Sequence, residues 1–429
     1  MRHFATRVLG PEDRRESIGK TDSTRPSGHL DSRRTLAIYL AAGAAFAAVS
    51  SRGLTVPLYA HQLGASRFLV GALFSVSMLA AALLSLPSGV LIDRFGARAV
   101  LGFAVALSAA SQLAIAGTTT VGPLFLWQAT GGLATGAQLA AVLSVITESF
   151  PKGHLGQAMG WLTFSMQAGS FMGPSIAGLA LQWLDLRSDI ALTTGLIVLA
   201  VPGVILATNT RQSGQRLSLW VPLRSLVTQP SFIPMTIGLV AATLVWGTVS
   251  AFLPIFGKES LNLSSPQVGL LLALQAVVNG VTRLPGGWLV DRVRHRWLIV
   301  FVGVSAWSVA VIVLGHLSGF WMPVLLLILA TPFMAAAFVA VGVVFADLSA
   351  GSTRGVALGS YGAILFLGLA AGPLLFGPVV QSYGYAIGFT SCAVLGMALA
   401  VVMAAWRAEP LKRRTNIPIP PTGPGPWRS

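Results

Sequence analysis

Charge is scarce in this chain of 429 residues. Charged residues make up 10% of it, whereas a soluble domain carries about 25%. Hydrophobic residues supply 54% and the mean hydropathy is +0.75, so an ordinary soluble fold is excluded. A membrane helix needs about 20 apolar residues, and runs of that length follow one another from residue 35 to residue 406. Because backbone polar groups must pair within lipid, we predict an all-α protein with twelve transmembrane helices.

Cysteine is almost absent as well. The single Cys392 excludes an internal disulfide and a cysteine-based metal site. The chain has no Walker loop for ATP, and no nucleophile paired with a base in the membrane. We therefore expect no enzyme activity, no metal and no cofactor.

Acidic residues number thirteen, and none falls in the middle of a predicted span. A proton relay normally uses an Asp, Glu or His within the membrane. Here Glu148 and Asp347 lie at predicted inner ends, and His61 and His316 at outer ends. If the proton is the coupling ion, it would act through Glu148, Asp347 or the substrate.

The net charge of +15 at first suggests a nucleic-acid partner, but the positions of the basic residues argue against one. The predicted cytoplasmic tails and loops hold 23 of the 28 Lys and Arg residues, and Arg67, Arg187 and Lys258 fall in outer loops. This bias predicts a multi-pass protein of the cell membrane with both termini in the cytoplasm. The predicted organisation is a disordered tail over 1–34, a six-helix bundle over 35–208, a cytoplasmic linker over 209–230, a second bundle over 231–407 and a disordered tail over 408–429.

An internal repeat relates the two bundles. Residues 87–98 read PSGVLIDRFGAR and residues 285–296 read PGGWLVDRVRHR, an offset of 198. Val70-Gly71 and Val268-Gly269 share this offset. A repeat of about half the chain length indicates a duplicated, pseudo-symmetric bundle.

The pattern Gly-x-x-x-Asp-Arg-x-Gly-x-Arg between the second and third helices resembles the signature of the major facilitator superfamily. The first copy matches at Gly89, Asp93, Arg94, Gly96 and Arg98. The second copy keeps glycine, acid and base, with Arg294 in place of the second glycine. The resemblance covers about residues 35–407. It implies the twelve-helix fold of that superfamily, in two six-helix bundles around a central cavity.

The resemblance also implies an inner charge cluster that latches the bundles together when the cavity opens outward. The alternative is solvated loop charge that only sets topology. The predicted gating residues are Gly89, Asp93, Arg94, Gly96, Arg98 and Glu148 in the first half, and Gly287, Asp291, Arg292, Arg296 and Asp347 in the second.

A second motif also recurs, at an offset of 199. It resembles the glycine-proline motif of antiporters in the superfamily, although Ala177 replaces one further glycine. The motif predicts close helix packing with a proline bend, and an efflux-specific meaning stays open beside packing alone. Its residues are Gly169, Gly173, Pro174 and Gly178, and then Gly368, Gly372, Pro373 and Gly377.

Polar residues inside predicted spans are candidates for the substrate cavity. Arg52 lies in the first helix, where a structural role and a substrate role are equally open. Gln275, Asn279 and Arg283 fall on one face of the eighth helix. The family's proton-coupled drug exporters place an arginine in the fourth helix, where this chain has Trp127 or Gln128.

Together these features predict a secondary transporter working by alternating access, with a small-molecule substrate, the lipid bilayer as its environment, no nucleic-acid partner and a monomeric state. The resemblance to drug exporters and the few charges favour export of a small, mostly apolar compound, in the manner of an antiporter. Uptake or exchange of a small anion or metabolite is the second hypothesis, favoured by Arg52 and Arg283. A non-transporting sensor on the same fold is the third.

Overall fold

The computed structural model describes residues 32–85, 87–149, 155–206, 227–348 and 354–415. Most of the predicted tails and linker lie outside these ranges. In the first half the helices are α2 (Ser32–Gln62), α3 (Arg67–Ser85), α4 (Pro87–Phe95), α5 (Ala97–Gly117), α6 (Val121–Ser149), α7 (Leu155–Ala180), α8 (Leu186–Val198) and α9 (Val201–Leu206). In the second half they are α11 (Phe232–Glu259), α12 (Ser265–Arg292), α13 (Arg296–Leu314), α14 (Trp321–Asp347) and α15 (Arg354–Thr415).

These helices form the twelve spans that the sequence predicts. The second span consists of α3 and α4, and the sixth of α8 and α9. The 62 residues of α15 contain the last two spans, because Gly384 breaks the helix with a φ of 83° that favours glycine. Within the described residues, nine helices are long and apolar enough to cross a bilayer, and one of these is the stretch Gly359–Trp406 that holds both final spans.

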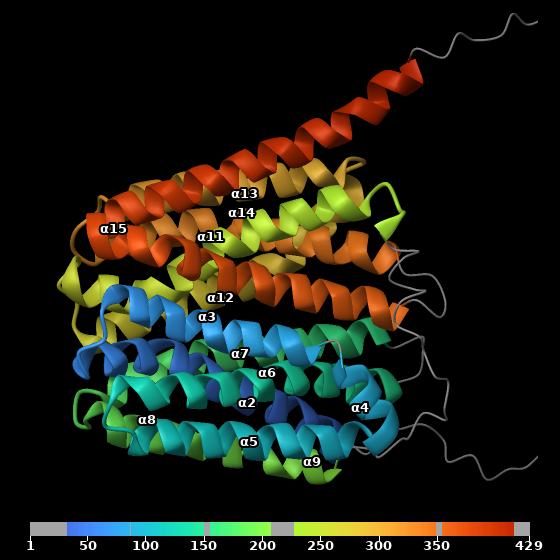
Figure 1. The fold of residues 1–429 in the computed structure, drawn as a ribbon. Helices are drawn as coiled ribbons and strands as arrows, with labels where there is room; N and C mark the ends of the chain where they lie inside the picture. Colours follow the sequence, from blue (N-terminus) through green and yellow to red (C-terminus); the bar gives the residue numbers. More distant parts are fainter. Residues whose placement is uncertain (1–31, 86, 150–154, 207–226, 349–353, 416–429) are drawn as a thin grey trace, which may run out of the picture.

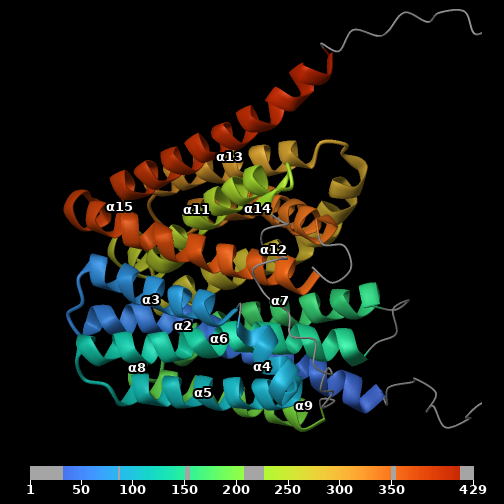
Figure 2. The same ribbon diagram turned by 45° about the vertical axis from the view of Figure 1, so that its right-hand side comes forward.

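The helices of the two halves form two adjacent bundles. Figures 1 and 2 show α2–α9, in blue to green, on one side and α11–α15, in yellow-green to red, on the other. Along the boundary α3 packs against α15, and α7 packs against α12. We name the end where α2 begins and α15 terminates the tail end, and the opposite end, where α2 leads into α3, the loop end.

Three boundaries differ from the prediction. Helix α2 begins at Ser32 and α15 continues to Thr415, so residues 32–34 and 408–415 are helical where disordered tails were expected. The second span was expected to end near residue 91, but helix continues through the charged link because α4 reaches Phe95. The reversal is confined to Gly96, whose φ of 87° is strained for other residues, and α5 starts at the next residue.

The first two glycines of each glycine-proline motif lie where two helices of one bundle approach closely. A methyl group on Gly169 or Gly173 would collide with the carbonyl oxygens of Gly43 and Ala47 on α2. In the second bundle, Gly372 faces the carbonyl of Leu244 on α11 and Gly368 faces the Thr243 hydroxyl. Because lipid offers no hydrophobic force between helices, such backbone approach is a main source of packing energy.

This packing makes a matched prediction. Gly173→Ala and Gly372→Ala should each destabilise the protein by about 1–3 kcal/mol, because the new methyl meets backbone that cannot move away. Gly160→Ala in α7 and Gly362→Ala in α15 should be neutral, since nothing lies within 4 Å of either position. The measurement is thermal unfolding in detergent. Equal melting temperatures in all four variants would contradict the packing role.

Candidate functional site

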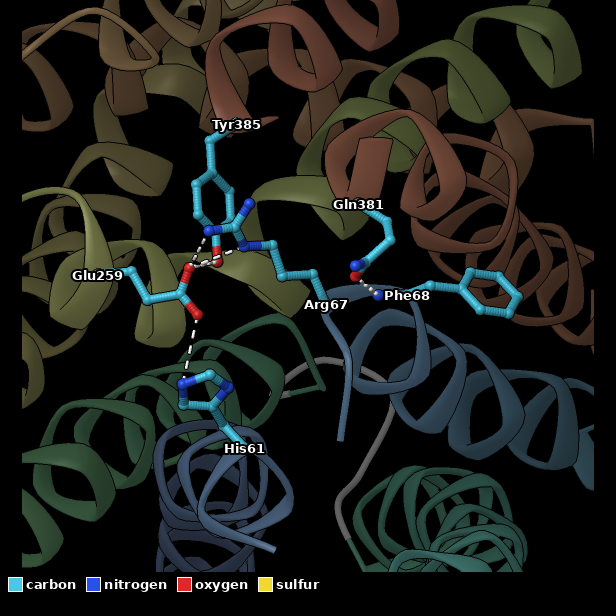
Figure 3. A network of polar contacts seen from close by, with 6 residues as sticks. All are labelled: His61, Arg67, Phe68, Glu259, Gln381 and Tyr385. Atoms are coloured by element: carbon cyan, nitrogen blue, oxygen red, sulfur yellow. Dashed lines mark hydrogen bonds and ion pairs between the residues drawn. The ribbon is translucent and has the colours of Figure 1, made fainter. Parts of the chain in front are cut away.

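A polar network at the loop end joins the two bundles (Figure 3). The carboxylate of Glu259 accepts hydrogen bonds from Nε and Nη2 of Arg67, both at 2.7 Å, and from the hydroxyl of Tyr385 at 3.0 Å. Nε2 of His61 lies 3.3 Å from its other oxygen. The Arg67 guanidinium also stacks over the Tyr385 ring at 4.8 Å. One carboxylate of the second bundle therefore holds two basic side chains of the first.

Helix ends bring these side chains together. His61 is in the last turn of α2, Arg67 starts α3 and Glu259 ends α11. Tyr385 follows the break in α15. Glu259 is only 19% exposed, so its ion pairs are partly shielded from solvent and stronger than surface pairs. Sequence reasoning placed His61 and Arg67 on the outer side without pairing them, and it did not single out Glu259.

Beneath the network, the bundles meet along two related helix pairs. A methyl on Gly269 of α12 would lie 2.6 Å from the Pro174 carbonyl oxygen on α7. A methyl on Gly71 of α3 would lie 3.3 Å from the Pro373 carbonyl oxygen on α15. Gly178 likewise faces Gly269, and Gly377 faces Phe68. We call these two contacts the glycine seam; it uses the repeated Val-Gly pair and the last part of the repeated glycine-proline motif.

A polar contact also crosses the boundary deeper in the membrane. The side-chain amide of Gln167 on α7 donates to Oδ1 of Asn279 on α12 at 3.1 Å, and to the Ala276 carbonyl at 3.3 Å. Nε of Arg283 donates to the same Asn279 oxygen at 3.1 Å. Asn279 and Arg283 are thus joined as the predicted stripe suggested, whereas Gln167 was missed. Gln275 is buried, and its amide nitrogen has no partner among the described residues.

Arg52 lies against a separate cavity of about 120 Å³ between α2, α3 and α6. Its side chain is 5% exposed, and Nη2 donates to Oγ1 of Thr135 at 3.3 Å. Gln128, one of the two candidates for the position at which the family's proton-coupled exporters have arginine, lines the same cavity. The predicted candidates on α12 do not line it. The full lining is Val49, Arg52, Gly53, Val56, Pro57, Val70, Leu73, Phe74, Ser77, Met78, Gln128 and Thr135.

The predicted inner latch is only partly described. Arg296 of α13 pairs with Asp347 of α14, so this ion pair lies within the second bundle and does not join the two bundles. Arg292 stacks on Trp288, its Cζ 3.4 Å from the ring centroid, and Asp291 is exposed. The side chains of Asp93 and Glu148 lie outside the described residues.

The remaining latch residues show few contacts. Arg94 lies over the ring of Phe95 at 5.3 Å, and Arg98 is exposed. Nothing stands within 4 Å of a methyl placed on Gly89 or Gly287. Gly96 makes the turn between α4 and α5. A role of these residues in gating stays a prediction.

One acid is buried in a way that the sequence did not indicate. Asp189 is fully buried in the first turn of α8, and neither carboxylate oxygen has a hydrogen-bond partner among the described residues. The nearby Gln112 uses its amide nitrogen on Thr193, and its own oxygen also lacks a partner. Over the described ranges, no group of His, Cys, Asp or Glu side chains is arranged to hold a metal ion.

Comparisons with known proteins agree with this architecture. The model of the Major Facilitator Superfamily matches residues 38–264 and 235–429. The chain is 24% identical to the MFS-type transporter SLC18B1 of Mus musculus over 430 residues, which is 92% of each chain. A solved bacterial homologue of the human lysosomal transporter Spinster superposes with a TM-score of 0.70 at 16% identity, covering 90% of this chain and 97% of that one. The nucleoside transporter NupG superposes with a TM-score of 0.69 at 15% identity, covering 87% and 99%.

The chain belongs to the Major Facilitator Superfamily and is a multi-pass membrane transporter. This confirms the predicted family and the twelve-helix fold. At such identities the solved structures establish the fold alone, so substrate, direction and coupling have to be argued from this chain's own residues.

Asp189 supplies a stability prediction. An ionised carboxylate without a partner is costly to bury, so Asp189→Asn should raise the melting temperature by roughly 2 °C at neutral pH. The control is Asp185→Asn, four residues earlier and solvent-exposed, where a hydrogen bond from Ser188 lowers the pKa of the carboxyl. Ionisation of Asp185 therefore favours the folded state above its usual pKa, and its replacement should not stabilise. Lower stability of the Asp189 variant would show that its carboxylate has an ionic partner.

Proposed function

We propose that this protein is a secondary active transporter that exports a small, mostly apolar compound across the cell membrane by alternating access. The observation that carries the proposal is the Glu259 network. It joins the bundles at the loop end, and it consists of non-covalent contacts that can be broken. Alternating access needs such a closure, stable in one conformation and absent in the other.

The direction of export depends on the orientation expected from the basic residues. With both tails in the cytoplasm, the loop end faces outward, and the described conformation is the one closed to the outside. A substrate would then enter from the cytoplasm and leave when the Glu259 network separates. The proton is our candidate coupling ion, and we expect it to act through Glu148, Asp347 or the substrate, since no acid falls in the middle of a predicted span.

The Arg52 cavity supports the substrate class. Most of its lining is apolar, from side chains such as Val56, Leu73, Phe74 and Met78. The polar groups are few, which is the usual composition of a small-molecule site. We expect the protein to act as a monomer, since each bundle contributes to the Glu259 network within one chain.

Transport by purified protein in proteoliposomes tests this function. Neutral, acidic and basic aromatic compounds of similar size are loaded in turn, and their efflux is followed under a pH gradient. Efflux of at least one class above that of protein-free liposomes is expected. An efflux rate no higher than that of protein-free liposomes, for every class of compound, would favour the sensor hypothesis. Flux that runs only in the uptake direction would favour uptake or exchange of a metabolite.

Glu259 gives a sharper prediction about closure. Ser75 lies within the glycine seam, and its hydroxyl donates to the Ala370 carbonyl of the other bundle at 2.8 Å. In a background lacking Cys392, a cysteine at Ser75 should react slowly with a membrane-impermeant maleimide. Glu259→Gln should raise that rate about five- to tenfold, because it removes the ion pair with Arg67 and weakens the contact with His61, both of which stabilise the closed end.

The matched control is Asp347→Asn, which also breaks an ion pair with arginine but within the second bundle. It should leave the labelling of the Ser75 cysteine unchanged. Equal rates in the parent and the Glu259 variant would show that the network does not hold the bundles together.

A further inference from the structure

The guanidinium of Arg52 is a buried charge without a counter-charge. Helix α2 places it ten residues before Gln62, about 15 Å below the loop end at 1.5 Å per residue. Its hydrogen bond to Thr135 is to a neutral hydroxyl, and Nη1 has no partner. Among the described side chains no carboxylate pairs with it. A buried arginine in this state is unfavourable unless an anion joins it.

The surroundings of Arg52 leave room for that anion. The cavity of about 120 Å³ adjoins the guanidinium and includes the hydroxyls of Ser77 and Thr135 and the amide of Gln128. The Ser77 hydroxyl and the Gln128 amide can donate hydrogen bonds to a carboxylate. The Thr135 hydroxyl donates to the Gly131 carbonyl at 2.9 Å and accepts from Arg52, so it holds the guanidinium in place. The volume compares with a cavity of about 150 Å³ that binds benzene in another protein. The single positive charge of Arg52, together with these few hydrogen-bond donors, suits a ligand that carries one negative charge.

The rest of the cavity lining suits an apolar body. Val56, Leu73, Phe74 and Met78 carry no charge and lie on α2 and α3. A ligand with a carboxylate at one end and a small hydrocarbon or aromatic part at the other would match both the polar and the apolar lining residues. A dianion such as phosphate would leave one charge uncompensated.

We propose that Arg52, with Ser77 and Gln128, binds the carboxylate of a small organic monoanion in this cavity. The inference rests on the proposed function, since it takes the cavity as the substrate site and narrows the substrate to compounds with one acidic group. It narrows the small, mostly apolar compound to an amphipathic one.

Gly131 allows the charge to be moved without being removed. A methyl on Gly131 would collide with Nη1 of Arg52, which is the flexible end of a side chain, and would lie 2.8 Å from the Ser111 hydroxyl. Gly131→Ala should therefore displace the guanidinium while the helices stay in place. By contrast, a methyl on the neighbouring Gly132 would collide with the Ser77 backbone, so that position is no suitable control.

The experiment measures binding of benzoate and of its neutral analogue benzamide to the purified full chain in detergent, at constant ionic strength. Wild type should bind benzoate in preference to benzamide. Arg52→Gln should weaken benzoate binding about ten- to hundredfold, as loss of a charge-assisted hydrogen bond requires, and leave benzamide unchanged. Arg52→Lys should recover part of the loss, because it keeps the charge without the planar fork. Gly131→Ala should also weaken benzoate binding, although the charge of Arg52 is kept, because the guanidinium is displaced.

The control variant is Arg187→Gln, which removes an exposed arginine at the loop end and should bind benzoate like wild type. Thermal unfolding without either probe, in a buffer that contains no carboxylate, gives a second readout. There Arg52→Gln should melt no lower than wild type, since it removes an uncompensated charge. Equal affinity for the two probes, no benzoate binding at millimolar concentration, or a lower melting temperature of Arg52→Gln in the carboxylate-free buffer would overturn the proposal. Efflux of neutral compounds that persists in Arg52→Gln would reject this site and leave the transporter proposal standing.

Discussion

The close approach of two helix pairs, α3 with α15 and α7 with α12, is the constraint on which the rest of this structure depends. Two apolar bundles in lipid gain little from burying apolar surface against each other, so their association depends on packing and on polar contacts. Glycines at the crossings let backbone meet backbone, as Gly269 does at Pro174. Where backbone meets backbone in this way, the helices can separate without large side chains having to be repacked.

Polar contacts along the same boundary determine how firmly it closes. Glu259 holds Arg67 and His61 at the loop end, and Gln167 donates to Asn279 deeper in the membrane. Such contacts are few and each is modest in energy, so the closed state is stable yet reversible. The cavity beside Arg52 lies in the first bundle near this boundary, because α3 forms part of both the glycine seam and the cavity wall.

The sequence alone was sufficient for the fold, because hydropathy and the repeat at offset 198 report on local helix formation and on duplication. It also indicated that Asn279 and Arg283 share a helix face, since helical periodicity is local. It could not pair Glu259 with Arg67, which are 192 residues apart and meet only through the packing of α3 beside α11 and α15. The burial of Asp189 was missed for a similar reason: α8 begins with a polar turn that reads as surface, and tertiary packing covers it.

The central claim is that closure at the loop end and opening at the tail end are one movement about the glycine seam. Pulsed electron spin resonance tests this claim by measuring distances between spin labels on the two bundles. One pair, at Gln182 and Ser260, reports on the loop end, and the other, at Ala99 and Arg294, reports on the tail end. Gly269→Ala, whose methyl would strike the Pro174 carbonyl, should lengthen the loop-end distance and shorten the tail-end distance together, whereas Gly195→Ala, with nothing within 4 Å, should change neither. Unchanged distances at both ends in the Gly269 variant, or a change at one end alone, would contradict the account.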